Sequence, residues 1–256
     1  MNLCGFLQIH NESERGNLRR CLNNMRQFCD DICIYDDGST DDSVAVCREY
    51  TPHVILGGTR DFQRELFHKQ QLLEYALTLN PDWIFWQDAD EVVDRFGTTG
   101  GLRRLAETAR LDIKAYGFKE VNMWRSERWA RDDGAWGPPW FVRLWRVVPG
   151  MHIQTAEGLD RPSYPCHIKT YSQSTIRVVH YKFSDYKRLL WGAGLGNMTT
   201  EEFQKYAVGN FILDESNCKC YRVPDEWFPV ENVPTGEWPE PTPIPISELK
   251  AYRDLP

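Results

Sequence analysis

The sequence lacks several features that mark whole classes of protein. No stretch approaches the roughly 18 consecutive apolar residues of a membrane-spanning helix, which favours a soluble protein without a transmembrane segment. Acidic side chains (37) outnumber basic ones (30). This balance argues against sequence-independent nucleic-acid binding, because such binding needs basic surface to displace counterions. The first residues contain neither a basic region nor a long apolar core, so we expect no secretory signal.

The eight cysteines also lack the spacings that are typical of redox motifs or zinc sites. None form a Cys-x-x-Cys pair, and no Cys/His cluster has the spacing of a zinc site. We therefore expect free thiols in a reducing compartment, which predicts a cytoplasmic location. No Gly-x-Gly-x-x-Gly follows the first predicted strand, which weakens a dinucleotide-dependent oxidoreductase as an interpretation.

The first half of the sequence has a regular alternation of short apolar runs and amphipathic stretches. The patterns predict strands at residues 3–9, 32–35, 54–56 and 82–86. Between them, helices are expected after an N-cap at Ser13, from Ser43 to Tyr50, and along an apolar stripe that starts at Phe62. Such a βαβαβαβ order indicates an α/β fold with a parallel sheet covered by helices.

The second half is less regular. We expect a helix at residues 102–109 and strands at 114–122, 141–147 and 176–181. From Pro224 onward, eight of the fifteen prolines fall within 33 residues, which predicts an extended arm, either laid over the domain or flexible. The predicted domains are a body at residues 1–220, divided at residue 98, and the arm at 221–256.

Two acidic clusters follow predicted strands of the first half. One spans residues 36–42, and the other is Gln87-Asp88-Ala89-Asp90-Glu91. In parallel sheets, ligands bind beyond the carboxyl ends of the strands, where both clusters fall. Two carboxylates one residue apart can share a hard divalent cation that also takes phosphate oxygens. A solvated acidic turn is the alternative.

At this point the sequence resembles a known family. Residues 34–43 resemble the first signature of the family 2 glycosyltransferases of the GT-A fold. Asn11-Glu12 after the first strand, and residues 86–91 after the fourth, are similar to two further landmarks in the same order. The resemblance covers residues 2–95 well and 115–182 loosely. It implies a Rossmann-like GT-A fold and transfer of a sugar from a nucleotide-diphosphate donor to a hydroxyl acceptor.

The resemblance also implies roles for individual residues at the donor site. Asn11 and Glu12 would help to bind the donor, Asp37 would accept hydrogen bonds from the base, and Asp88 would lie near the ribose. The metal ligands would be Asp90 and His180, with Asp90 binding Mn²⁺ or Mg²⁺ that bridges the diphosphate.

Two of these side chains keep an alternative interpretation. Where the family has an Ala-Arg-Asn stretch, this chain reads His68-Lys69-Gln70, so Lys69 contacts phosphate or extends its amine past the apolar stripe to water. His180 serves metal or phosphate, or is a satisfied core histidine.

The acceptor half is predicted from the same resemblance. An inverting transferase needs a carboxylate to take the proton of the acceptor hydroxyl, and Glu157 stands at the matching place. Asp132, Asp133 and Asp160 compete for that role. The sequence from 124 to 145 contains five of the ten tryptophans. Their rings either stack on acceptor sugars or fill the core; the platform candidates are Trp124, Trp136 and Trp140.

Two other functions stay open. One is a carbohydrate- or nucleotide-binding module without catalysis, which would have no need to keep both Asp88 and Asp90. The other is a sugar-nucleotide pyrophosphorylase, because Gly57-Gly58-Thr59-Arg60 echoes its glycine-rich loop, although it follows the third strand rather than the first. The acidic net charge disfavours docking on an anionic membrane, so a glycan or glycoprotein acceptor is preferred.

Overall fold

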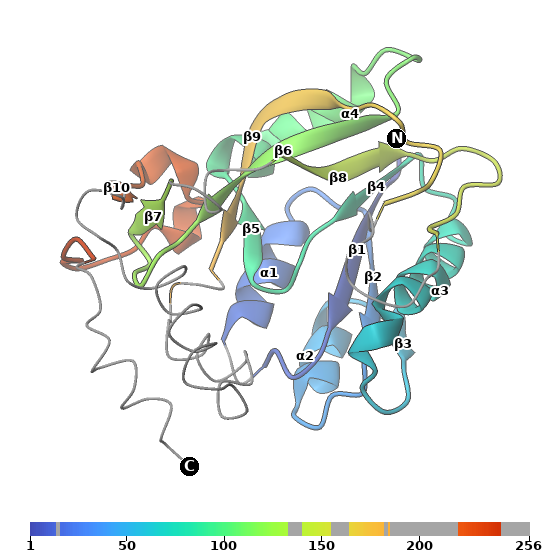
Figure 1. Cartoon of the computed structure of the whole chain (residues 1–256), viewed down its shortest axis with the longest axis horizontal. Coiled ribbons are helices and arrows are strands. Elements are labelled where there is room, and N and C mark those ends of the chain that lie inside the picture. The colour runs from blue at the N-terminus through green and yellow to red at the C-terminus, as the bar shows by residue number, and fades with distance from the viewer. Residues whose placement is uncertain (14–15, 133–139, 155–163, 182–183, 185–219, 242–256) are drawn as a thin grey trace, which may run out of the picture.

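A computed structural model of the 256-residue chain describes residues 1–13, 16–132, 140–154, 164–181, 184 and 220–241 (Figure 1). Its strands are β1 (Leu3–Ile9), β2 (Asp31–Asp36), β3 (Val54–Leu56), β4 (Trp83–Trp86), β5 (Glu91–Val93), β6 (Ala115–Asn122), β7 (Trp129–Arg131), β8 (Trp140–Arg146), β9 (Ser172–His180) and β10 (Cys220–Arg222). Its α-helices are α1 (Asn17–Met25), α2 (Ser43–Tyr50), α3 (Glu65–Leu77) and α4 (Leu102–Glu107). Short helical turns span Phe62–Arg64, Gly97–Gly101, Asp225–Trp227 and Val230–Asn232.

The central sheet has eight strands in the order β3-β2-β1-β4-β8-β6-β9-β5. Strands β3, β2, β1 and β4 are mutually parallel, β8 runs antiparallel to both β4 and β6, and β5 runs antiparallel to β9. The predicted α/β class with a mostly parallel sheet is confirmed. The alternation predicted for the first half is confirmed as well, with the bounds of β1, α2 and β3 as expected.

Helices cover both faces of this sheet. Helices α1, α2 and α4 pack one apolar cluster against the strands, through side chains such as Leu22, Val46 and Leu102. Helix α3 packs a second cluster on the opposite face, through Leu66 and Leu73. Figure 1 shows α1 and α2 on one side of β1 and β2, and α3 on the other. The sheet is therefore buried on both faces at its parallel end, as its unbroken apolar strands require.

The structure corrects several predicted boundaries and adds three short strands. Strand β9 begins four residues before its predicted start at 176, and α4 ends at Glu107 rather than at 109. The residue that caps α1 is Gly16, at φ 72°, rather than Ser13, whose backbone N–H instead donates to Ser43 Oγ at 2.9 Å. The sequence patterns did not predict β5, β7 or β10, each of three residues. Unlike β3, whose three residues are all apolar, each of these runs contains a charged residue, so none forms a short apolar run that predicts a strand.

The described part of the proline-rich segment lies on the body of the protein. β10 pairs with β7, and Val223 and Phe228 are fully buried beside Val121 and Tyr181. Arg95, which follows β5, donates from Nε to the Phe228 carbonyl at 3.2 Å. This segment therefore covers the β6–β9 end of the sheet.

No helix in the described part of the chain has the length and apolar character needed to cross a bilayer. The described cysteines are free thiols.

The side chain of Asn24 protects the edge of the sheet at β5. Strand β5 pairs only with β9 in the described sheet, so one side of its backbone faces α1. The Asn24 amide is fully buried there, and it accepts from the Val93 N–H at 2.8 Å and donates to the Val93 carbonyl at 3.0 Å. This pairing fixes the segment that carries the second acidic cluster.

We predict that Asn24→Ala lowers the free energy of unfolding by about 2–4 kcal/mol, because both Val93 backbone groups lose their partner while buried. Urea denaturation followed by circular dichroism measures this. The matched control is Asn23→Ala on the exposed side of the same helix, which is expected to change stability by less than about 0.5 kcal/mol. Equal effects of the two substitutions would contradict the role given to Asn24.

Candidate functional site

Both acidic clusters lie at the carboxyl edge of the parallel strands. The Asp37 N–H continues the β1–β2 ladder by donating to the Ile9 carbonyl at 2.8 Å. On the other side of β1, the Gln87 N–H donates to the Phe6 carbonyl at 3.2 Å and continues the ladder with β4. The clusters therefore leave the sheet on either side of one strand, where ligands of open α/β sheets bind.

Asn11 and Glu12 hold the first acidic cluster in place. Asn11 adopts φ 50°, its Oδ1 accepts from the Thr40 N–H at 2.8 Å, and its own N–H donates to Ser39 Oγ at 2.9 Å. The Glu12 N–H donates to Ser43 Oγ at 2.9 Å. These contacts tie the loop after β1 to the turn between β2 and α2.

Asp37 is nearly buried, with 3% of its surface exposed. Its Oδ1 lies 3.3 Å from Nδ1 of His68 on α3 and accepts from the Asp61 N–H at 3.4 Å. The His68 ring stacks on Tyr35 at a centroid distance of 4.7 Å. His68 therefore connects the end of β2 to α3 at the residue predicted to bind the base.

Lys69 does not extend to solvent. Its side chain is 3% exposed, its Nζ lies 2.5 Å from Glu65 Oε1 one turn earlier, and the same Nζ lies 4.0 Å from the centre of the Trp86 ring. The positive charge of Lys69 is thus tolerated on the apolar face of α3 because it pairs with the Glu65 carboxylate and with the face of the Trp86 ring.

The second acidic cluster brings Asp90 next to His180. Asp90 Oδ1 lies 3.5 Å from His180 Nε2, and the Tyr181 N–H donates to the Asp90 carbonyl at 2.8 Å. His180 Nδ1 donates to Asn122 Oδ1 at 3.0 Å. Because an amide oxygen only accepts, this bond places a proton on Nδ1 and aims Nε2 at Asp90.

Asp88 is more exposed and is fixed from two sides. Its Oδ1 accepts from Trp86 Nε1 at 3.1 Å, and its Oδ2 accepts from Arg143 Nη1 at 3.3 Å. The side chain keeps 41% of its surface exposed. It therefore stays accessible to a ligand above the sheet edge.

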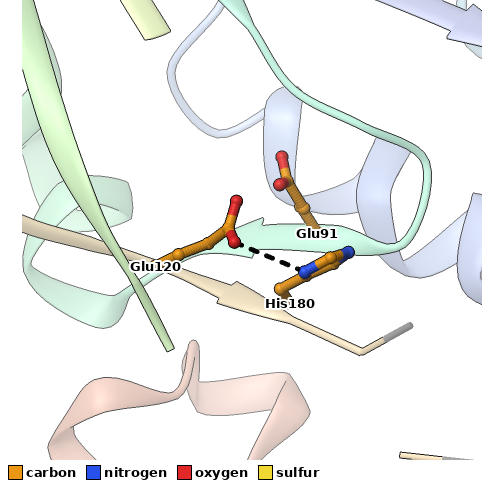
Figure 2. A group of neighbouring side chains, drawn as sticks. All are labelled: Glu91, Glu120 and His180. Carbon is orange, nitrogen blue, oxygen red and sulfur yellow. Dashed lines mark ion pairs between the residues drawn. The ribbon is translucent and has the colours of Figure 1, made fainter. Parts of the chain in front are cut away.

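A group of possible metal ligands consists of Glu91, Glu120 and His180 (Figure 2). They come from β5, β6 and β9, and one ligand atom from each lies within 4.8 Å of the others, a spacing that can hold a metal ion. The site between the two glutamates contains Arg143 from β8, whose Nη2 lies 2.5 Å from Glu91 Oε1 and 2.9 Å from Glu120 Oε1.

The electrostatics of this group follow from burial and from its ion pairs. Burial acts to lower the pKa of Arg143, but the carboxylates of Glu91, Asp88 and Glu120 outweigh it, and the pKa rises. Burial also acts to lower the pKa of His180, and Asp90 and Glu120 raise it well above its ordinary value. The acids around both side chains thus favour their protonated forms, and a metal ion at His180 Nε2 would have to replace the proton on that nitrogen.

Sequence reasoning missed Arg143, Glu91, Glu120 and Asn122. Arg143 stands in a strand of alternating pattern, where a charged residue is expected to face solvent, yet only 3% of it is exposed. The available signal was Glu120, a charged residue in strand β6, whose residues are all buried apart from Lys119.

The remaining predicted residues belong to the acceptor half. Trp124 is fully buried beneath Arg131, so in this conformation its ring offers no face to a sugar. Trp140 is half-buried at the start of β8, and Asp132 is exposed after β7. Glu157, Trp136, Asp133 and Asp160 lie outside the described residues.

Comparison with known families assigns this arrangement. The model of glycosyl transferase family 2 matches residues 7–176. The chain belongs to this family. Its mixed α/β architecture is the GT-A fold that the resemblance implied.

Individual relatives are more distant. The SPbeta prophage-derived glycosyltransferase SunS of Bacillus subtilis strain 168 is 28% identical over 92 residues, which cover 36% of this chain and 20% of SunS. The uncharacterized protein Rv3786c of Mycobacterium tuberculosis is 25% identical over 197 residues, covering 72% of this chain and 47% of that protein. The chain thus spans less than half the length of these relatives.

Solved structures with partial likeness include two glycosyltransferases. Staphylococcus aureus TarS in complex with UDP-GlcNAc is 13% identical with a TM-score of 0.35, over 48% of this chain and 34% of TarS. Glucosyl-3-phosphoglycerate synthase of Mycobacterium tuberculosis with Mn²⁺ and UDP-glucose is 15% identical with a TM-score of 0.33, over 47% and 43%.

The buried pair of Lys69 and Glu65 gives a stability prediction. Lys69→Met is expected to change the free energy of unfolding by less than about 1 kcal/mol, because Glu65 keeps 23% of its side chain exposed and can hydrate. Glu65→Ala is expected to cost about 2–3 kcal/mol, because the lysine is left buried without its carboxylate. Urea unfolding of both variants tests this order, and a larger loss for Lys69→Met would refute it.

Proposed function

We propose that this domain transfers a sugar from a nucleoside-diphosphate donor to a hydroxyl group of a glycan or glycoprotein, with Mn²⁺ or Mg²⁺ bound and with inversion at the anomeric carbon. Membership in glycosyl transferase family 2 supports the reaction class. The metal dependence, the stereochemistry and the residue roles that follow are part of the proposal.

The observation on which it depends most is the pairing of Asp90 with His180. The two residues stand 90 positions apart in the sequence, and the fold brings Asp90 Oδ1 to within 3.5 Å of His180 Nε2. Both side chains keep some exposure, 18% and 13%. A carboxylate oxygen and an imidazole nitrogen with its tautomer fixed by Asn122 form a donor set that suits a divalent cation.

The charge balance also favours a bound cation. Among the described side chains, Asp88, Asp90, Glu91 and Glu120 form ion pairs with Arg143 and His180, so the carboxylates of this group outnumber its basic side chains by two to one. Such repulsion is relieved by cations. A divalent ion held here would neutralise the negative charge that develops on the departing diphosphate.

The donor side of the proposal uses the first half of the chain, residues 1–98. Asp37 accepts hydrogen bonds from the base, Asp88 lies near the ribose, and Asn11 and Glu12 shape the loop that faces the donor. Lys69 is paired with Glu65, so we assign it no phosphate contact. Its contacts with Glu65 and Trp86 instead hold α3 against β4 beneath the donor.

The acceptor side uses residues 99–220. Glu157 takes the proton of the acceptor hydroxyl as that oxygen attacks the anomeric carbon, with Asp132, Asp133 and Asp160 as the competing bases. Trp136 and Trp140 offer rings for stacking on acceptor sugars, and Trp124 supports them from the core. Residues 221–256 are the proposed proline-rich arm, and Val223 and Phe228 of its described part pack against Val121 and Tyr181 of this half.

A donor screen tests the reaction class. With Mn²⁺, the protein is expected to bind one nucleotide sugar and to hydrolyse it slowly, as measured by release of the nucleoside diphosphate. Chelation should stop the release, because the departing diphosphate then keeps its charge. No binding and no release with UDP-, GDP- or dTDP-sugars would contradict the proposal, whereas binding without release, with or without acceptor extracts, would favour the non-catalytic module.

We predict that Asp90→Asn weakens Mn²⁺-dependent nucleotide binding by more than about 100-fold, since even outer residues of metal sites contribute about 10- to 100-fold. Isothermal titration with UDP, GDP and dTDP measures it. The control is Asp42→Asn, which removes an exposed carboxylate from the neighbouring acidic cluster and is expected to bind like the wild type. Retained binding by Asp90→Asn would refute the metal assignment.

We predict that Glu157→Gln keeps donor binding and lowers the rate of transfer by about 10²- to 10⁴-fold, the usual contribution of a general base. Asp160→Asn serves as the matched control, with little loss expected. If Glu157→Gln transfers at the wild-type rate, the base is another residue.

A further inference from the structure

We propose that Arg143 is a built-in cation that occupies the space between Glu91 and Glu120, and that it thereby confines a bound divalent ion to the Asp90 side of His180. This inference rests on the proposed function, because it takes Asp90 and His180 as the ligands of that ion. It assigns a positioning role to Arg143 and excludes the buried glutamates as metal ligands.

The geometry of the guanidinium supports this role. Nη2 bonds both Glu91 Oε1 at 2.5 Å and Glu120 Oε1 at 2.9 Å, and Nη1 bonds Asp88 Oδ2 at 3.3 Å. One side chain thus bonds three carboxylates, which come from the loop after β4, from β5 and from β6. A planar fork of donors can do this, whereas the single ammonium of a lysine cannot match all three directions.

The surroundings hold the guanidinium in place. Its Cζ lies 4.4 Å from the centre of the Trp86 ring and 5.4 Å from that of Phe141. The residue is 3% exposed, so water cannot replace it. A metal ion at Glu91, Glu120 and His180 would have to displace this cation, and two cations cannot share the same carboxylates without strong repulsion.

Arg143 therefore separates two sets of side chains, the buried glutamates Glu91 and Glu120 and the proposed metal ligands Asp90 and His180. The buried glutamates bind Arg143 and support the site from behind, since Glu91 Oε2 also accepts from the Asp88 N–H at 2.9 Å and Glu120 Oε2 lies 3.6 Å from His180 Nδ1. In the described part of this site, Asp90 and the Nε2 side of His180 lie outside the contacts of Arg143, and these are the proposed ligands of the metal ion. Arg143 therefore determines where the ion sits.

A rescue experiment with Mn²⁺ alone tests this. Bound Mn²⁺ is counted from the loss of the free-ion signal in electron paramagnetic resonance. Asp90→Asn is expected to lose the bound ion. Adding Arg143→Gln to Asp90→Asn is expected to restore Mn²⁺ binding, tightening the apparent Kd by about tenfold or more over Asp90→Asn alone, because Glu91, Glu120 and His180 can then act together as ligands.

The matched control is Arg146→Gln in the Asp90→Asn background. It removes the same charge from the same strand, but Arg146 bonds the carbonyls of Ile113 and Ala109, away from the glutamates. It should restore nothing. A double variant with Arg143→Gln that binds no more Mn²⁺ than Asp90→Asn, while folded by circular dichroism, would overturn the inference.

A second variant decides the matter if the Arg143 change prevents folding. Glu120→Gln leaves Arg143 in place and should still bind Mn²⁺, with the Kd weakened by no more than about tenfold, as for an outer residue of the site. Loss of the bound ion in Glu120→Gln would overturn the inference. Binding retained by Asp90→Asn but lost in Glu120→Gln would refute both this inference and the proposed ligands, whereas loss in Asp90→Asn with no rescue would refute this inference alone.

Discussion

The contact between the Arg143 guanidinium and three carboxylates is the interaction on which the site depends. Strand β8 inserts a cation next to β4, and the acids on the segment after β4 and on β6 close around it. Glu91, with no exposed side-chain surface, would be very costly to bury as an isolated charge. With the guanidinium present, the protein can keep Asp88 and one further acid, Asp90, at the edge of the sheet, where the proposal places the ligand.

The fold supplies the positions that this interaction needs. Antiparallel pairing of β8 with β4 and of β5 with β9 turns the parallel half of the sheet into a mixed sheet just where the chemistry lies. In the register of the adjacent strands β5 and β9, Glu91 lies opposite His180. Asp90, the residue before Glu91, therefore falls next to the imidazole. The pairing of Asp90 with His180 is therefore a result of strand register.

Local patterns explain how much of this was predictable. Strands of four or more residues and the helices between them have clear periodicity, so the parallel half and the placement of Asp37, Asp88 and Asp90 at its edge followed from the sequence. Strand β5 did not, because its three residues begin with an acid, unlike the wholly apolar β3, and because its edge is closed by Asn24 from a distant helix. Arg143 was missed for a similar reason, since a charge in an alternating strand normally faces water, and only the three acids brought together by the fold make it a buried residue.

Direct location of the ion tests the central claim best. Anomalous diffraction from crystals of the wild-type protein with Mn²⁺ and a bound nucleoside diphosphate would show where the metal lies relative to Asp90, His180 and Arg143. The account predicts one anomalous peak within bonding distance of an Asp90 oxygen and His180 Nε2, with Arg143 still between Glu91 and Glu120. A peak between those two glutamates, with the guanidinium displaced, would contradict it.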